Sequence, residues 1–293
     1  KERKQGSYAT TFEYDIIGNI KKVTDPFSLE VNYTPDTLNR LHTVEVDGKT
    51  FVYEYYDDGM IKSITYPDTG KGTLQTTYTY DNINRMTTMT NKLGTKIISQ
   101  FSYEYDNNGN ITKITENGDV TEYEYDELNR LSAVKIPGVR TITYTYDSRG
   151  NRATQSDTLK SDQTVIPGSF TYNSWDQMST FTSGMNTYEY KYDPQGLRIQ
   201  KMGPNENIRY HLDDNGRVIA ESDGSGQVKA QNIWGYQVLS RKIDGKYYYY
   251  IYNGHGDVIQ IVDESGNIVN TYKYDEWGNL LFKDEEIYNP IRY

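Results

Sequence analysis

The sequence has no cysteine among its 293 residues and only three histidines. The missing cysteines exclude disulfides and thiolate metal sites. His42, His211 and His255 lack the close spacing of a metal-binding motif, so a structural or exposed role is the simpler interpretation. No apolar run approaches the length of a membrane helix, and no signal-like apolar segment lies near Lys1. We therefore expect no membrane insertion by this segment, no metal and no cofactor.

Positive charge and aliphatic residues are also scarce. The net charge is −10 and the pI is about 4.9, which disfavours a nucleic-acid partner. Hydrophobic residues make up 35%, little for a solid globule but enough for a sheet with one solvated face. Tyrosine is abundant, with 30 residues against 7 phenylalanines, and Tyr, Ile, Val and Thr all favour strands.

One phrase recurs along the whole chain. "YEYDNNGNI" (Tyr103 to Ile111) returns as "YEYDELNRL" and as "YTYDSRGNR". Copies begin every 20 to 25 residues or so, a period that fits one β-hairpin. Aligned on the second aromatic position, the copies fall at Tyr14, Tyr33, Tyr55, Tyr80, Tyr105, Tyr125, Tyr146, Tyr172, Tyr192, Leu212, Tyr252 and Tyr274, with a degenerate copy near Tyr236.

Each position of the repeat has a local physical reason. Two tyrosines at i and i+2 of a strand point to the same face. The aspartate then begins a four-residue turn, and glycine or asparagine ends it because both tolerate a positive φ. "DGKT", "ENGD", "IPGV" and "DGSG" (beginning at Asp47, Glu116, Ile136 and Asp223) supply the return turns. The predicted fold is all-β: tandem hairpins stacked into a curved, spiralling sheet.

Two further patterns refine this prediction. The turn-ending residue alternates at first between glycine and asparagine, which indicates that neighbouring hairpins are not equivalent. Apolar pairs three residues apart follow the turns, as at Ile111 and Ile114. That spacing does not match a regular strand, and the segments are too short and too rich in Thr and Ile for a helix. We interpret them as strands that contain a bulge.

The residues predicted to carry the repeat are structural, and none is assigned a catalytic, cofactor-binding or metal-binding role. They are Tyr14, Asp15, Gly18, Tyr80, Asp81, Asn84, Tyr103, Tyr105, Asp106, Gly109, Tyr123, Tyr125, Asp126, Asn129, Tyr144, Tyr146, Asp147, Gly150, Tyr190, Tyr192, Asp193, Gly196, Tyr272, Tyr274, Asp275 and Gly278.

These tandem copies resemble the YD-repeat family, also called the rearrangement-hotspot (Rhs) family, from Phe12 to about Asn279. The stretch from Tyr247 to Asn279 is similar to the segment that precedes the family's core, and "NPIRY" at Asn289 to Tyr293 to the beginning of that core. We thus expect one continuous array of 12 or 13 copies over residues 1–293, with a truncated transition toward the core over 247–293.

The resemblance implies a hollow β-shell. In bacterial polymorphic toxins and insecticidal toxin complexes such a shell encloses a toxic segment, and in teneurins a related shell belongs to an adhesion receptor. The aspartate-dependent autoproteolytic motif of the bacterial core is absent from this sequence, so no catalytic residue is carried over. The sequence also lacks a plug for either end, which suggests an open, curved section.

Enzymatic and ligand-binding alternatives have weaker support. A glycosidase needs one carboxylate pair with one raised pKa, whereas an equivalent aspartate recurs in most hairpins. "DNNGN" at Asp106 and "DDNG" at Asp213 lack the downstream glutamate of a calcium loop. Ser222, Ser225 and Ser265 lie in turn-like strings, and "GHGD" at Gly254 lacks the lysine of a phosphate loop.

Aromatic clusters invite a binding interpretation. Tyr247 to Tyr250, with Tyr252, could stack on sugars or bases, but an aromatic ladder between strands explains them as well. We interpret Trp175, Trp234 and Trp277 as packing residues.

Two functions remain open. The leading hypothesis is a non-enzymatic shell wall in a secreted protein, or one of the bacterial cell surface or wall, which sequesters a C-terminal toxin domain of the same polypeptide. The alternative is an adhesion module that binds a cell-surface receptor or glycan through an exposed aromatic patch. Unpaired sheet edges also predict self-association.

Overall fold

The computed structural model describes residues 1–157 and 168–292, and over these ranges the protein is entirely β. Within them no helix is long and apolar enough to cross a membrane. The strands form two antiparallel sheets, one of 15 strands and one of 12, and in each sheet the spatial order follows the chain. The predicted fold class, a succession of hairpins, is confirmed.

The first sheet consists of β1 (Glu2–Gln5), β2 (Tyr8–Tyr14), β3 (Ile20–Thr24), β4 (Glu30–Pro35), β5 (Leu41–Val46), β6 (Lys49–Tyr55), β7 (Ile61–Asp68), β8 (Thr73–Tyr80), β9 (Met86–Leu93), β10 (Lys96–Tyr105), β11 (Ile111–Glu116), β12 (Asp119–Tyr125), β13 (Leu131–Ile136), β14 (Arg140–Tyr146) and β15 (Arg152–Asp157). The second consists of β16 (Gly168–Tyr172), β17 (Met178–Ser183), β18 (Asn186–Tyr192), β19 (Arg198–Gly203), β20 (Glu206–Leu212), β21 (Val218–Asp223), β22 (Val228–Trp234), β23 (Val238–Ile243), β24 (Lys246–Tyr252), β25 (Val258–Asp263), β26 (Ile268–Tyr274) and β27 (Leu280–Glu285).

A bulge follows the repeat turns and explains the spacing of three. Between β10 and β11, Tyr105 pairs with Ile111 and Glu104 with Lys113, so Thr112 has no partner. The extra residue restores Ile111 and Ile114 to one face, and both line the same cleft. The same register shift occurs where β12 pairs with β13 and where β14 pairs with β15. The interpretation as bulged strands is therefore confirmed.

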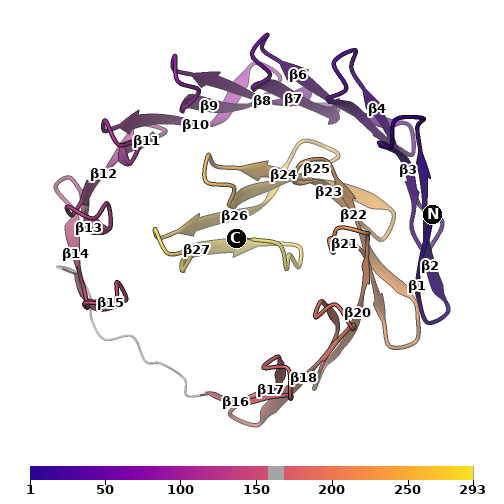
Figure 1. Cartoon of the computed structure of the whole chain (residues 1–293). Helices are drawn as coiled ribbons and strands as arrows, with labels where there is room; N and C mark the ends of the chain where they lie inside the picture. The colour runs from indigo at the N-terminus through magenta and orange to yellow at the C-terminus, as the bar shows by residue number, and fades with distance from the viewer. Residues whose placement is uncertain (158–167, 293) are drawn as a thin grey trace.

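The two sheets form a spiral that overlaps itself (Figure 1). The first sheet makes the outer arc, and β22 to β27 of the second sheet lie inside it, so we call these two layers the outer and inner winds. One hydrophobic cluster joins them, with Phe51, Tyr53 and Tyr66 from the outer wind and Tyr249 and Ile251 from the inner wind. The chain thus goes beyond the open section expected from the sequence, because the inner wind covers the concave face of the outer one.

Candidate functional site: the repeat turns, the seam and the cleft between the winds

In most copies the aspartate caps its own turn, whereas Asn173 and Asn253 do so in two others. In the copy at Asp126, the carboxylate Oδ1 accepts hydrogen bonds from the backbone N–H groups of Leu128 (2.9 Å) and Arg130 (3.0 Å), and Oδ2 accepts one from Arg130 Nε (2.7 Å). The arginine and the two N–H groups hold the pKa of Asp126 below its ordinary value. A glycosidase acid needs the opposite shift, so this arrangement serves the turn.

The residue that ends each turn adopts the positive φ expected from its type. Gly109 has φ 90°, and Asn129 and Asp176 have φ values of 58° and 57°. The same turn occurs at the predicted return turn that begins at Asp223. Asp223 Oδ1 accepts hydrogen bonds from the backbone N–H groups of Ser225 and Gln227, and Gly226 has φ 90°. Both the repeat turns and some return turns are therefore built in one way.

In most copies the second aromatic residue ties its hairpin to the preceding one. The Tyr125 hydroxyl donates to the carbonyl of Ile111 (2.8 Å), the first residue of the previous hairpin's return strand. Trp234 does the same through Nε1 to the Val218 carbonyl (2.8 Å), which locates the degenerate copy expected near Tyr236. Equivalent bonds run from Tyr55, Tyr80, Tyr105, Tyr146, Tyr192, Tyr252 and Tyr274.

Where the winds overlap, the first tyrosine of two copies, Tyr53 and Tyr103, meets a glycine of the inner wind. The Tyr103 hydroxyl accepts a hydrogen bond from the Gly254 N–H at 2.8 Å. A Cβ at Gly254 would lie 2.3 Å from that oxygen, and one at Gly235 would lie 2.1 Å from the Tyr53 oxygen. The repeat pattern does not point to these two glycines, because neither occupies its turn-ending position.

Charged side chains line the same seam between the winds. Asp47 of the outer wind accepts hydrogen bonds from Lys242 and the Tyr247 hydroxyl, both at 2.6 Å, and Lys49 pairs with Glu264 at 2.6 Å. Tyr247, Tyr249 and Tyr250 are buried here, as the ladder interpretation of this cluster requires.

Trp175 does not pack as predicted. It is 82% exposed, because it lies at the tip of the loop between β16 and β17, where no inner wind covers the sheet. Trp277 does pack: its ring lies 5.4 Å from that of Tyr144 and beneath the Arg152 guanidinium at 4.4 Å.

The three histidines lie apart from one another, and each makes different contacts. His42 Nδ1 lies 2.9 Å from the Tyr53 carbonyl, and His255 Nδ1 lies 3.0 Å from Asp257. His211 is buried between the rings of Tyr8 and Phe27, with Nε2 2.9 Å from Ser222 Oγ. Over the described residues, no three His, Cys, Asp or Glu side chains are grouped as metal ligands.

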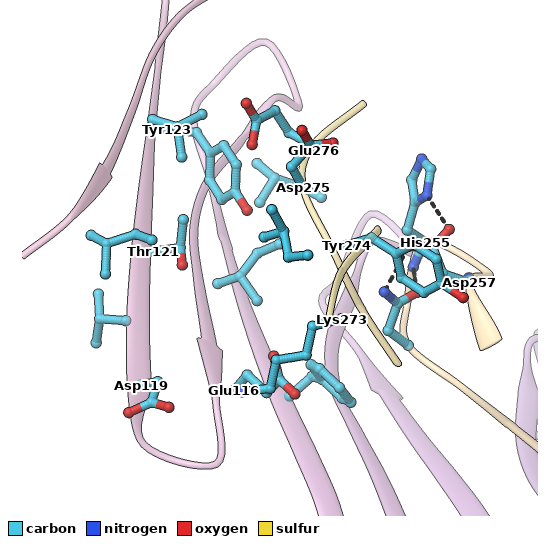
Figure 2. Close-up of a pocket in the computed structure, with 18 of the residues that line it drawn as sticks. Glu116, Asp119, Thr121, Tyr123, His255, Asp257, Lys273, Tyr274, Asp275 and Glu276 are labelled. Carbon is cyan, nitrogen blue, oxygen red and sulfur yellow. Dashed lines mark hydrogen bonds and ion pairs between the residues drawn. The ribbon is translucent and has the colours of Figure 1, made fainter. Parts of the chain in front are cut away.

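A cleft of about 730 Å³ separates the outer wall at β11 to β14 from the inner strands β25 to β27 (Figure 2). Apolar side chains of both winds line it, including Leu131, Val134 and Ile259. Glu116 and Glu276 also line it, and burial raises the pKa of both carboxyls. The cleft lies on the concave side of the outer wall and is lined by ionisable as well as apolar groups.

Comparison with curated proteins finds bacterial relatives. The chain is 31% identical to the tRNA3(Ser)-specific nuclease WapA of Bacillus spizizenii and to the tRNA nuclease WapA of Bacillus subtilis strain 168, over 71% of this chain. In each case the alignment spans only 12% of the relative, so the nuclease names describe much longer proteins.

Solved structures share the fold. The Photorhabdus luminescens Tc holotoxin pore matches with a TM-score of 0.76 at 16% identity, over 98% of this chain and 18% of that one. The TcdB2-TccC3 crystal structure matches with a TM-score of 0.76 at 15% identity, over 98% and 19%.

The family profile described as "Teneurin YD-shell" matches residues 66–243, more than half of the chain. Together with the observed repeat turns and bulged hairpins, this match shows that the chain belongs to the YD-shell family, whose members form shells from YD or Rhs repeats.

Proposed function

We propose that this chain is a non-catalytic wall segment of an encapsulating β-shell, in a secreted or cell-surface polymorphic toxin. The shell sequesters a toxic C-terminal domain of the same polypeptide. Membership in the YD-shell family and the WapA relatives support the shell and its toxin context. Its physical task is to keep the cargo from its target until delivery.

The observation that carries the proposal is the position of residues 286–292. This segment returns to the inner wind, and Figure 1 shows the C-terminal end at the centre of the spiral. Asn289 is fully buried and accepts a hydrogen bond from the Tyr250 hydroxyl (2.7 Å), and the Arg292 carbonyl accepts one from the Val258 N–H (2.8 Å). A polypeptide that continues from this anchored segment enters the space enclosed by the wall.

We also infer that residues 1–293 form one continuous array of 12 or 13 copies, in which 247–293 is the transition toward the core. The tyrosine, aspartate and glycine or asparagine of each copy act as its structural unit: the tyrosines join hairpins and winds, and the aspartate fixes the turn. The bonds of Tyr125 and Asp126 described above support this role.

Protease protection of the native, uninterrupted polypeptide tests the proposal. We expect a C-terminal domain that co-elutes with the shell in gel filtration and resists trypsin until the shell is unfolded by urea. The matched control is the same C-terminal domain expressed alone, which trypsin should digest at once. Equal digestion rates for the enclosed and the isolated domain would refute encapsulation.

A second function, adhesion, is favoured by one specific observation. Phe170, Tyr172 and Trp175 of the β16–β17 hairpin are all at least half exposed, at 50%, 58% and 82%. Exposed aromatic faces bind sugars and protein receptors. Saturable binding to a glycan array that Trp175→Ala abolishes would favour adhesion, and a blank array would remove it.

Self-association is the remaining proposal for a partner. β1, β15, β16 and β27 are the edge strands of the two sheets, and β27 exposes Leu281 and Phe282 at its edge. Light scattering of the chain should detect oligomers whose fraction falls with Phe282→Lys, because charge on an edge strand opposes pairing. A monomer at all concentrations would contradict this.

A further inference from the structure

The cleft between the winds is lined by two dissimilar walls. Figure 2 shows Glu116, Asp119 and Tyr123 on the outer wall, and Lys273, Tyr274 and Glu276 on the inner hairpin. Its volume of about 730 Å³ lies within the range of pockets that hold small molecules or short peptides. The two winds also contact each other near the cleft, where the Trp277 ring packs on Tyr144.

Several charges that line the cleft are already occupied. Asp257 accepts a hydrogen bond from Asn253 Nδ2 (2.8 Å) and Asp275 accepts one from Asn279 Nδ2 (2.9 Å), both within their own turns. Arg140 lies 3.3 Å from a carboxylate oxygen of Asp157. These groups hold the local structure, and Asp257 and Asp275 keep their negative charge because their asparagine partners are neutral.

Three more carboxylates line the cleft, so its lining holds five carboxylates against two cations, Arg140 and Lys273. Glu116 and Asp119 come from the hairpin of β11 and β12, and Glu276 from the turn between β26 and β27, with Lys273 as the nearby cation. Oε1 of Glu276 is shielded from solvent and, within the described part of the chain, accepts no hydrogen bond, while the Trp277 side chain and the Glu276 N–H serve the rest of the carboxyl and partly offset its raised pKa. A buried carboxylate oxygen without a donor is costly, so a ligand that donates there gains free energy.

The rest of the lining is apolar. Leu131 and Val134 of β13 face Ile259 of β25 and Leu281 of β27 across the cleft. A ligand that fits both features has aliphatic groups and a cationic donor. A nucleotide or an acidic peptide is disfavoured by the same carboxylates.

We propose that this cleft binds a short polypeptide segment that carries a basic side chain between apolar ones. The inference rests on the proposed function, because the enclosed polypeptide is the chain that the concave side would meet. The basic side chain lies between Glu116 and Glu276, and its apolar neighbours pack on Leu131 and Ile259. The wall thus binds the enclosed chain at a specific site as well as confining it.

Fluorescence anisotropy of a labelled peptide tests this directly on the full 293-residue chain. The probe is fluorescein-Leu-Val-Lys-Val-Leu-amide, which carries one basic side chain between apolar ones, and the control peptide has glutamate in place of the lysine. We expect saturable binding of the basic peptide, and binding at least about tenfold weaker for the acidic one, the usual effect of one lost charge-assisted hydrogen bond.

Two substitutions locate the site. Glu116→Gln and Glu276→Gln keep the side-chain volume, and each should weaken binding of the basic peptide about tenfold. The matched control is Glu124→Gln, on β12 but paired with Lys135 away from the cleft, which should leave binding unchanged. Far-ultraviolet circular dichroism confirms that each variant is folded.

Equal affinity for the basic and acidic peptides, or binding that neither cleft substitution alters, would overturn the proposal. A Leu131→Lys variant gives a second, independent readout, because its cation should abolish binding of the basic peptide by repulsion. Protection of the enclosed domain from trypsin is a separate measurement. Protection without peptide binding therefore rejects only this site, and peptide binding without protection rejects only the enclosure.

Discussion

The contact between Gly235 and Tyr53 gives the sharpest test of how the winds are joined. Gly235→Ala adds a Cβ that would lie 2.1 Å from the Tyr53 oxygen and 3.0 Å from Cζ of that ring. The ring cannot retreat, because Tyr53 is fully buried. Since Gly235 does not have a positive φ, the backbone itself accepts alanine. Overpacking of this kind costs about 1–3 kcal/mol of unfolding free energy.

Removal of the tyrosine oxygen should restore most of the unfolding free energy that Gly235→Ala loses. Tyr53→Phe alone loses only a long hydrogen bond from the Tyr236 N–H, at 3.4 Å, and should cost about 1 kcal/mol. In the double variant the closest contact of the new methyl group becomes Cζ at 3.0 Å, which small shifts relieve. We therefore expect Gly235→Ala with Tyr53→Phe to be about 1 kcal/mol more stable than Gly235→Ala alone.

Urea unfolding followed by the fluorescence of Trp234, the neighbour of Gly235, is the suitable assay. The four proteins of the cycle should have equal slopes against urea, so that midpoints convert to free energies. Tyr80→Phe serves as the control tyrosine, since its hydroxyl bonds within the outer wind to the Ile61 carbonyl (3.0 Å). Additivity of the two substitutions within about 0.5 kcal/mol would refute the close contact.

Three further predictions concern the repeat and the seam. Tyr125→Phe should lower the unfolding free energy by about 1 kcal/mol by removing the bond between hairpins, whereas Tyr172→Phe, in an exposed ring, should change the urea midpoint little. Asn84→Ala, at φ 63°, should cost about 1 kcal/mol and Asn84→Gly almost nothing in the same assay. Burial lowers the pKa of His211 to about 4 from an ordinary 6.5, so the unfolded chain takes up the proton first. Stability should therefore fall as the pH drops from 6.5 toward 4, and urea midpoints of His211→Phe should show a flatter profile over that range; an unchanged slope would contradict this.

Local sequence determined the hairpins well, because each device acts within a few residues. The cap at Asp126 reaches only to Arg130, and the bulge at Thr112 follows from the spacing of Ile111 and Ile114. Such features depend on hydrogen bonds and backbone preferences that one copy of the repeat contains in full. They were therefore predictable from a single copy.

The contacts between the winds were not predictable in the same way. Tyr53 and Gly235 belong to different sheets, and the repeat motif marks neither as special. Their meeting depends on the summed curvature of the hairpins between them, to which every bulge and turn contributes a little. The exposure of Trp175 has the same origin, since the overlap of the winds does not reach the β16–β17 hairpin.

Equivalent residues of the repeat show what the overlap does energetically. Tyr103 and Phe170 hold the same position in their copies, yet Tyr103 is 7% exposed beneath the inner wind and Phe170 is 50% exposed where the wall is single. Burial of apolar area stabilises the folded protein by about 25 cal/mol per Å². Apolar side chains on the concave face of a single wall therefore contribute less stability than covered ones. A second wind recovers this stability at Tyr103. Under the proposed function, the enclosed polypeptide covers the single wall and is stabilised there by the same apolar side chains that a second wind buries elsewhere.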